Sequence, residues 1–459
     1  MKSAIKITSI FQKDWKKYLT SQSVKRKSWM ESMQFQAKQA TFCFIPGADG
    51  KLSEILLGVK DENDFWSFGA LPPVLPSGNY RIDAKYTISQ FENIALAWEL
   101  GSYQFLRYKK KAKAHSAKLM LNAVTRKKAL KEMIDVFYFV RDAINTPTED
   151  FGPEELANAA EKIAEQFSAH FQQMIGDELL TENYPLIHAV GRAASRKPRL
   201  IDFTWGNEAD PKVTLVGKGV CYDTGGLSIK SNSSMKPMKK DMAGAAQVLG
   251  LAWLLMANRF PVRLRVLIPA VENAVSGNSY RPGDVFTARD GTHVEIGDTD
   301  AEGRLILADA LCEAVREKPD LVIDFATLTG AQRVAMGPDI PTFFTEDAAF
   351  SADLLASSQL HQDPIWPLPL YSDYKEYLKS DIADISNSSN QPYGGAITAA
   401  LFLQHFVGKN TAWCHFDFMG ANLQTRPGRP KGGEAQGLRA VFYALGQRYI
   451  KHPSGEVTN

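Results

Sequence analysis

Val216–Asp241, with the sequence VGKGVCYDTGGLSIKSNSSMKPMKKD, is a polar, glycine-rich segment between two apolar ones. The apolar residues of Lys212–Val216 predict a buried strand that leads into it. Ala243–Asn258, which follows it, has the length and composition of a buried helix. In α/β proteins a polar segment between a strand and a helix lies at the carboxyl end of the strand, where ligands bind. The segment therefore predicts both an α/β fold and the position of a site.

Strand-like and helix-like segments alternate through the rest of the chain. Further strands are predicted at Val262–Val271, Leu321–Phe325 and Thr411–Phe418, and an amphipathic helix at Ala301–Lys318. This alternation favours an α/β fold with a mostly parallel central sheet flanked by helices on both faces. A second polar segment, Gly297–Leu305 (GDTDAEGRL), overlaps the start of the amphipathic helix.

The length of 459 residues favours two domains. We predict a smaller α/β N-terminal domain over residues 1–125, a linker helix over 126–145 and a larger C-terminal domain over 146–459. In the first domain, Ala40–Pro46 and Glu54–Val59 indicate buried strands, whereas residues 1–40 show little periodicity.

Charge is unevenly distributed along the chain. Residues 1–130 contain 22 Lys and Arg against 10 Asp and Glu, whereas the remainder contains 31 against 41. The cluster Arg107–Lys113 (RYKKKAK) belongs to the basic part. A solvated surface is the simpler interpretation of this cluster, and a nucleic-acid-binding patch is the alternative.

Four widely spaced cysteines form no CxxC pattern, which favours reduced thiols over a disulfide framework or a zinc knuckle. The first residues contain no apolar run followed by a cleavage site, and no apolar stretch has the length of a membrane span. We therefore expect a cytoplasmic protein with no membrane partner.

The two polar segments contain four carboxylates near predicted strand ends and helix starts, namely Asp223, Asp241, Asp300 and Glu302. Carboxylate oxygens suit hard divalent cations, and zinc also accepts them. Asp300 and Glu302 are two residues apart, a spacing that can direct both at one pair of metal ions. Taken singly, Asp241 or Asp300 more often caps a helix than binds a metal.

Two lysines, Lys218 and Lys230, lie among these carboxylates. A lysine beside divalent cations has a depressed pKa, because the cations disfavour its charged form, and a neutral amine can bind metal. The spacings alone favour a metal-dependent and a phosphate-binding α/β enzyme equally. Lys218 and Gly219 lack the GxxxxGK[ST] arrangement of a P-loop, which disfavours the phosphate-binding alternative.

Four segments together resemble the M17 leucyl aminopeptidase (cytosol aminopeptidase) family, namely VGKGVCYDTGGLSIK, MKKDMAGAA, DTDAEGRLILADAL and DFATLTGA. They occur in family order within residues 140–425, whereas the N-terminal third resembles the family only in position and size. The resemblance implies that the C-terminal domain is catalytic and hydrolyses the N-terminal residue, leucine or another apolar residue preferred, from short peptides. It also implies a dinuclear metalloexopeptidase with a bridging hydroxide, assembled as a homohexamer.

Matched position by position, the resemblance assigns two divalent cations, Zn²⁺ and/or Mn²⁺, to five residues. Lys218, Asp223, Asp241 and Glu302 would hold the tighter ion. Asp223, Asp300 and Glu302 would hold the more exchangeable ion. Asp241 would also bind the free α-amino group of the substrate, which restricts hydrolysis to the N-terminal residue.

The resemblance also assigns roles outside the metal set. Lys230 would polarise the scissile carbonyl, and Arg304 would hold a bicarbonate ion that acts as the general base. The positions that would bind substrate are Met238, Thr327, Leu328 and Gly330, with Leu328 acting through its backbone. Some family members also bind DNA as regulators, so an additional DNA-binding role of the basic N-terminal region is the alternative function.

The chain departs from the family pattern at Asp298, where the family usually has asparagine. An extra carboxylate there could raise cation affinity, shift metal preference or simply point away from the metals. No histidine lies within either polar segment, and we predict that His293 and His415 are strand residues rather than metal ligands.

Overall fold

The computed structural model describes residues 4–83, 86–121 and 125–450 of the chain. These residues form two compact units. Unit 1 comprises the described part of 1–138 together with Leu423–Lys431, and unit 2 comprises the described part of the remainder. The domain limits predicted from the sequence stay a prediction.

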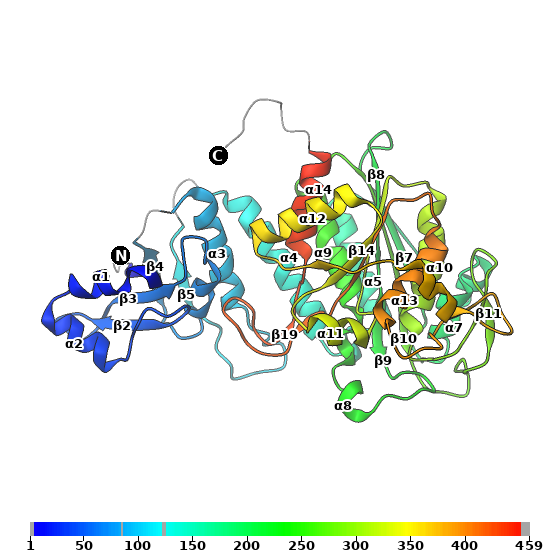
Figure 1. Cartoon of the computed structure of the whole chain (residues 1–459), viewed down its shortest axis with the longest axis horizontal. Coiled ribbons are helices and arrows are strands. Elements are labelled where there is room, and N and C mark those ends of the chain that lie inside the picture. Colours follow the sequence, from blue (N-terminus) through cyan, green and yellow to red (C-terminus); the bar gives the residue numbers. More distant parts are fainter. Residues whose placement is uncertain (1–3, 84–85, 122–124, 451–459) are drawn as a thin grey trace. The chain divides into compact units, whose positions relative to one another are not determined.

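A mixed sheet forms the centre of unit 1 and has, within the described ranges, the strand order β2-β3-β1-β4-β5 (Figure 1). The strands are β1 (Ile5–Phe11), β2 (Phe42–Pro46), β3 (Leu52–Val59), β4 (Gly78–Ile82) and β5 (Ala117–Leu119). β2 pairs antiparallel with β3, and the other neighbours pair parallel. The two strands predicted around Cys43 and Leu56 are therefore confirmed.

The sequence did not predict β1, β4 or β5, and of these β1 lies in the middle of the sheet. Only Ile7 and Ile10 of β1 are buried, so the two-residue alternation that indicates a strand is missing. Its position is instead determined by parallel pairing with β3 on one side and β4 on the other.

The helices of unit 1 are α1 (Trp15–Thr20), α2 (Val24–Ser32) and α3 (Ile88–Ser102). Thr87 and Gln90 form a capping box at the start of α3, in which each side chain accepts a hydrogen bond from the other's backbone N–H. The basic cluster Arg107–Lys113 is exposed in the loop between α3 and β5.

Leu423–Lys431 belongs to unit 1, although it comes from far along the sequence. A Cβ atom on Gly69 would overlap the backbone of Gly428, so the two segments approach each other at a distance that only glycine permits. The guanidinium of Arg429 lies 4.2 Å from the centroid of the Trp66 ring. This loop is therefore a structural part of the N-terminal unit.

The described residues of unit 2 contain a nine-stranded sheet in the order β15-β14-β17-β13-β8-β10-β7-β6, with β9 pairing to β10. Its strands are β6 (His170–Ile175), β7 (Arg199–Trp205), β8 (Lys212–Gly217), β9 (Gly219–Asp223), β10 (Arg263–Asn273), β13 (Leu321–Ala326), β14 (Thr342–Thr345), β15 (Trp366–Pro367) and β17 (Trp413–Asp417). The central pairs are parallel, whereas the pairs β10–β7, β7–β6 and β14–β17 are antiparallel. The predicted α/β class with a mostly parallel sheet is confirmed.

Helices cover both faces of this sheet (Figure 1). One layer contains α5 (Pro153–Gln166), α9 (Ala243–Ala257) and α14 (Leu438–Tyr449), with α12 (Ala348–His361) packed on α14. The other contains α7 (Pro185–Gly191), α10 (Glu302–Arg316) and α13 (Gly395–Val407), with α11 (Gly330–Met336) beside α13. Both α9 and α10 are buried along nearly their whole length, because each lies between the sheet and other elements.

Shorter elements complete unit 2. They are α6 (Glu178–Thr181), α8 (Asn232–Met235), β11 (Val285–Thr287), β12 (His293–Glu295), β16 (Ile385–Ser386), β18 (Ala421–Asn422) and β19 (Gly432–Gly433). The helix α4 (Lys127–Asn145) contains the boundary between the two units, which falls after Tyr138.

Smaller expectations concern the cysteines, two histidines and membrane-spanning segments. The four cysteines are buried and unpaired. His293 lies in β12 and His415 in β17, where the His415 ring is hydrogen-bonded to Asp324. Within the described ranges, no helix combines the length and the apolar character that crossing a bilayer requires.

His361, at the end of α12, gives the stability of unit 2 an expected pH dependence. Burial and the nearby charge of Arg439 lower the pKa of His361 to about 4, from about 6.5 in an unfolded chain. Because the folded-state pKa is depressed, the stabilisation is fully present above pH 6.5 and is lost as the pH falls towards 4. Over this pH range the free energy of unfolding is expected to fall by about 2 kcal/mol, a value reduced because the His361 side chain is partly exposed to solvent.

We expect His361→Gln to flatten the decline of the free energy of unfolding between pH 6.5 and 4, measured by urea denaturation. His170→Gln, at an exposed histidine of β6, is the matched control and retains the parent's slope. Equal slopes in the parent and in His361→Gln would contradict the prediction.

Candidate active site

A break in one strand supplies the first lysine of the site. β8 and β9 run along the same neighbour, β10, and Lys218 is the single residue between them. Its backbone N–H donates to the Phe325 carbonyl at the end of β13, 3.0 Å away. Asp223 is the last residue of β9 and is paired with Asn273 of β10. Lys218 and Asp223 therefore lie at the carboxyl ends of the central strands, where the sequence predicted a site.

Thr299 joins the two polar segments to each other. Its hydroxyl donates to the Gly225 carbonyl (2.7 Å) and accepts from the Ser228 N–H (2.8 Å). Its own carbonyl accepts from Asn273 Nδ2 (3.0 Å) and from the Tyr280 hydroxyl (2.6 Å). This network fixes Asp300 and Glu302 opposite Asp223.

Neither Asp241 nor Asp300 caps a helix. The residue at the N-cap of α9 is Met242, and that of α10 is Ala301; neither forms a side-chain cap. Asp241 belongs instead to a short 3₁₀ helix, η4 (Met238–Met242), and its carboxylate accepts a hydrogen bond from Thr327 (2.7 Å). Both carboxylates are therefore available for the site.

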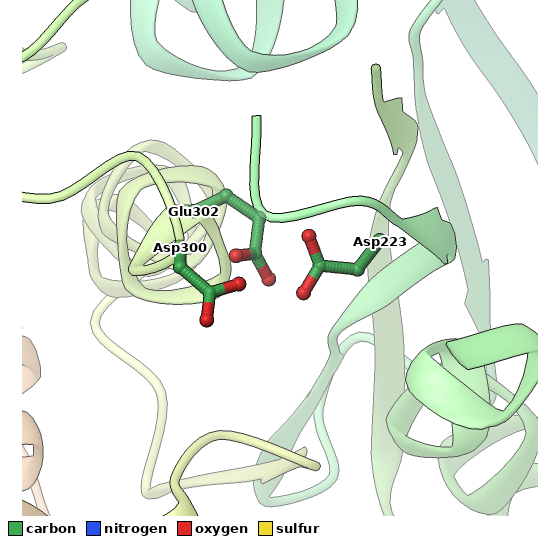
Figure 2. A group of neighbouring side chains, drawn as sticks. All are labelled: Asp223, Asp300 and Glu302. Carbon is green, nitrogen blue, oxygen red and sulfur yellow. The ribbon is translucent and has the colours of Figure 1, made fainter. Parts of the chain in front are cut away.

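Asp223, Asp300 and Glu302 form the centre of the site (Figure 2). One oxygen from each lies within 4.8 Å of the others. Lys230 Nζ lies 2.8 Å from Asp223 Oδ2 and also pairs with Asp300. Lys218 Nζ lies 2.8 Å from Glu302 Oε1 on the other side of the cluster.

Asp241 joins the cluster through the same lysine, with 2.8 Å between Lys218 Nζ and Asp241 Oδ2. Lys218 reaches both carboxylates because residue 303 is glycine. A Cβ atom on Gly303 would lie 2.6 Å from Lys218 Cε and 2.7 Å from its Nζ. The glycine of the DTDAEGR segment thus makes room for the lysine of the other segment.

The cluster contains more carboxylates than lysines. This excess of negative charge, together with burial, shifts the pKa values of both kinds of side chain. Burial and the charge of Asp223 raise the pKa of Glu302 to about 8 and that of Asp300 to about 6. Burial opposes the charged form of Lys218, but Asp241 and Glu302 outweigh it, so the pKa of Lys218 is raised. The pKa of Lys230 is raised as well, since burial is outweighed by Asp223.

The donor set of the cluster fits divalent cations. Glu302 is 1% exposed, yet its Oε2 atom has no hydrogen-bond partner among the described residues. A buried carboxylate oxygen without a partner is costly unless a cation or another donor reaches it. The excess negative charge around Asp223 is likewise costly unless a cation balances it. Lys218, Asp223, Asp241, Asp300 and Glu302 are all within this one cluster.

Arg304 lies in the first turn of α10, next to the cluster. Its Nη1 donates to the Asn387 carbonyl at 2.8 Å, whereas its buried Nε has no partner in the part of the chain that the structure describes. Burial lowers the pKa of Arg304 to about 10. The guanidinium therefore keeps a free donor that suits a small anion.

Of the predicted substrate-binding residues, Thr327 contacts the cluster directly. Met238 is buried in η4, and the Thr327 carbonyl accepts from Lys218 Nζ at 3.2 Å. The Leu328 N–H already donates to Asp417 (2.9 Å), so a backbone contact with a peptide would come from its carbonyl. Gly330 begins α11.

Sequence analysis missed the residues that orient these groups. Asn273 donates to Asp223 Oδ1 (2.9 Å), and Asp417 accepts from the N–H groups of Leu328 and Thr329 and from the Thr329 hydroxyl. Asn387 accepts from the N–H groups of Gly297 and Asp298. The available signal was that Asn273 comes two residues after the predicted strand Val262–Val271 and that Asp417 is the next-to-last residue of the predicted strand Thr411–Phe418.

Asp298 does not join the carboxylate cluster. Its Oδ1 accepts the N–H of Asp300 at 2.9 Å, which forms a short side-chain-capped turn. Asparagine could form the same bond with its own side-chain oxygen. The substitution of Asp for the family's usual Asn thus retains the turn that directs Asp300.

Fold and site together define an α/β protein with a largely buried cluster of carboxylates and lysines that suits divalent cations. Residues 138–442 match the catalytic-domain model of the cytosol aminopeptidase family, and residues 5–122 match the N-terminal-domain model of M17 aminopeptidases. The chain belongs to the cytosol aminopeptidase (M17) family.

Individual relatives agree with this assignment. A probable cytosol aminopeptidase of Chlamydia abortus is 42% identical over 316 residues, which are 67% of this chain and 63% of that protein. The match therefore spans less than two thirds of that relative's length. The crystal structure of a cytosol aminopeptidase from Coxiella burnetii is 48% identical, with a TM-score of 0.93 and 98% of both chains covered.

A second solved structure is similar at lower identity. The bottromycin maturation enzyme BotP in complex with Mn is 28% identical, with a TM-score of 0.86 over 96% of this chain and 98% of that chain.

Proposed function

We propose that the chain is a metal-dependent aminopeptidase that removes the N-terminal residue from short peptides, with leucine or another apolar residue preferred. The observation that carries the proposal is the cluster in which the buried Asp223 and Glu302 and the partly exposed Asp300 converge beside Lys230. Family membership supports the class of reaction.

The chain's own side chains supply binding and orientation. Lys230 is the donor that would polarise the scissile carbonyl and stabilise its developing negative charge. Asp241 would accept the free α-amino group of the peptide, which explains removal of only the first residue. Thr327 and Lys218 hold the Asp241 carboxylate in place for this contact. The Leu328 carbonyl would bind the peptide backbone.

The metal ligands in this proposal are Lys218, Asp223, Asp241, Asp300 and Glu302. When bound, two divalent cations, Zn²⁺ and/or Mn²⁺, would supply the activated water of a two-metal, bridging-hydroxide mechanism. The unpartnered Glu302 Oε2 supports this assignment, as does the manganese complex of BotP.

Arg304 would hold a bicarbonate ion that acts as the general base. The buried Nε without a partner supports this role, because an anion there would accept its hydrogen bond and neutralise its charge. We also propose a cytoplasmic location, in line with relatives named cytosol aminopeptidases. The assembly we propose, from the family resemblance alone, is a homohexamer.

Metal removal tests the proposal directly. We expect hydrolysis of Leu-p-nitroanilide and of leucyl dipeptides to vanish after treatment with a chelator and to return on addition of Zn²⁺ or Mn²⁺. The control is the far-UV circular dichroism spectrum, which stays unchanged if stripping leaves the fold intact. A folded protein that hydrolyses none of these substrates with any metal would sink the catalytic proposal.

An additional DNA-binding role is the second candidate, and the exposed basic loop Arg107–Lys113 is the observation that favours it. Binding of duplex DNA that falls steeply with salt, and falls further when the lysines of this loop are replaced, would support it. An exposed basic loop also suits a plain solvated surface, so the catalytic proposal comes first.

A further inference from the structure

Asn387 is a fully buried asparagine that follows the short strand β16 and lies outside both polar segments of the site. Its side-chain oxygen accepts hydrogen bonds from the N–H groups of Gly297 (2.8 Å) and Asp298 (3.2 Å). Its side-chain NH₂ group donates to the carbonyls of Asp298 (2.8 Å) and Ala301 (3.3 Å). An amide side chain can accept two hydrogen bonds and donate two, so Asn387 uses its whole capacity on residues 297–301.

The turn formed by residues 297–301 carries the proposed metal ligand Asp300. The groups that Asn387 binds lie on both sides of Asp300 in the sequence. Within the turn, Asp298 accepts the Asp300 N–H (2.9 Å), and the Ala301 N–H donates to the Asp298 carbonyl (3.3 Å). Without the Asn387 amide, these two local bonds would have to hold the turn alone, and four of its backbone groups would lose a partner.

Asn387 is itself held through its backbone. Its N–H donates to the Glu295 carbonyl (2.9 Å), which continues the parallel pairing of β12 with β16. Its carbonyl accepts from Arg304 Nη1 at 2.8 Å. Because these contacts do not involve the side-chain amide, Asn387 can serve as a fixed support to which the turn is bound.

A glycine allows the turn to approach this support closely. A Cβ atom on Gly297 would lie 2.2 Å from Ser388 Oγ and 3.0 Å from Ser386 Oγ. Atoms in a packed interior do not approach so closely without bonding, so a larger residue at position 297 would push the turn away from residues 386–388. Substitution of Gly297 therefore offers a second way to displace the turn, with Asn387 unchanged.

Asp300 depends on this turn more than Glu302 does. Glu302 begins α10, which is buried along nearly its whole length, and its carboxylate pairs with Lys218. The Asp300 side chain is 33% exposed and lies on the turn itself, where its carboxylate pairs with Lys230. A displaced turn would therefore move the Asp300 carboxylate and leave Glu302 nearly in place.

We propose that Asn387 is a positioning residue, whose amide holds the turn so that Asp300 faces the cluster, and that it thereby sets the affinity of the more exchangeable cation. In the proposed ligand sets Asp300 belongs to that cation alone. Hydrogen bonds that orient metal ligands typically change metal affinity by about tenfold to hundredfold when they are lost. This inference rests on the proposed aminopeptidase function and its two-cation site.

Isothermal titration calorimetry of the chelator-stripped full chain with Mn²⁺ tests the role of Asn387. In Asn387→Ala we expect the weaker of the two affinities to fall at least about tenfold and the stronger one to change by less than about threefold. A general loss of structure would weaken both, because Asp223 and Glu302 are assigned to both cations. Asn390→Ala, at an exposed asparagine of the same segment, is the matched control and retains both affinities.

Gly297→Ala displaces the same turn from its other side. The added methyl group would meet Ser388 Oγ, so the same selective loss of the weaker affinity is expected. The double variant Gly297→Ala with Ser388→Ala lacks that oxygen and is expected to bind the weaker cation more tightly than Gly297→Ala does. If Asn387→Ala fails to fold, this pair of variants carries the test.

The outcomes separate this inference from the proposed function. If the parent binds two cations and hydrolyses Leu-p-nitroanilide, an Asn387→Ala protein that retains both affinities, or loses both equally, overturns the role of Asn387 alone. Equal weaker affinities in Gly297→Ala and in the double variant count against it in the same way. A parent that binds no divalent cation and hydrolyses no substrate overturns the proposed function and this inference together.

Discussion

Lys230→Ala is expected to lower kcat for hydrolysis of leucine amides by about a thousandfold, with a much smaller change in KM. Lys230 Nζ is the donor that would meet negative charge as it develops on the scissile carbonyl, an interaction absent from the ground state. It lies between Asp223 (2.8 Å) and Asp300, which hold it at the edge of the carboxylate cluster. Steady-state kinetics with metal-reloaded protein measure the effect.

Two comparisons make this result specific. Lys236→Ala removes a lysine of the same polar segment that is exposed, and it is expected to retain the parent's kcat. Metal content is measured in parallel, because loss of Lys230 also leaves Asp223 and Asp300 without their ammonium partner. A fully metal-loaded Lys230→Ala protein with kcat within tenfold of the parent would show that Lys230 does not stabilise the transition state.

Glu302→Gln is expected to abolish detectable hydrolysis and to weaken divalent-cation binding by at least about a hundredfold. The substitution removes the negative charge of the most buried carboxylate in the cluster and replaces one ligand oxygen by an NH₂ group. Isothermal titration calorimetry with Mn²⁺ measures the loss of affinity, and the p-nitroanilide assay measures the loss of turnover.

The fold is expected to tolerate Glu302→Gln well. Burial and Asp223 raise the pKa of Glu302 to about 8, so the metal-free side chain is mostly protonated at pH 7. Glutamine matches that neutral form in shape, and the free energy of unfolding without metal is expected to change by less than about 1 kcal/mol. The same raised pKa makes cation affinity in the parent rise between pH 6 and 8, because the cation displaces a proton.

Asp298→Asn is the matched control for Glu302→Gln. It also neutralises a carboxylate of the DTDAEGR segment, but one that faces the Asp300 N–H rather than the cluster. Cation affinity within threefold of the parent is the expected result. Unchanged affinity in Glu302→Gln, or an equal loss in both variants, would contradict the assignment of Glu302 as a metal ligand.

The sequence was most informative where residue type and periodicity act locally. The buried runs of β8, β10 and β13 and the helices α9 and α10 were predicted nearly to the residue, because apolar composition and polar boundaries mark them. β1 was missed because only two of its residues are buried, and its place depends on pairing with β3 and β4. Pairing partners far apart in sequence leave no periodic signal.

The residues of the site also divide into those with a local sequence signal and those whose role depends on distant parts of the chain. Asp223 and Glu302 were noted because they lie near predicted element ends, and Lys218 because it lies among the carboxylates. The resemblance assigned all three to the metal ions, and the fold brings them together. Asn273 and Asp417 orient the site from strand ends that carry no distinctive local pattern. The capping alternative for Asp241 could be decided only by the position of Thr327 and Lys218, which come from other elements.

The loop Leu423–Lys431 has a consequence for how this protein could be recombined. The N-terminal unit is discontinuous in the gene, since its last piece is encoded some 280 codons after Tyr138. In this structure Gly428 and Arg429 of the loop pack against Gly69 and Trp66. If only the first gene segment were exchanged with that of a relative, the relative's residues at positions 66 and 69 would meet a loop from this protein. Viable chimaeras of this fold are therefore expected to exchange both gene segments together.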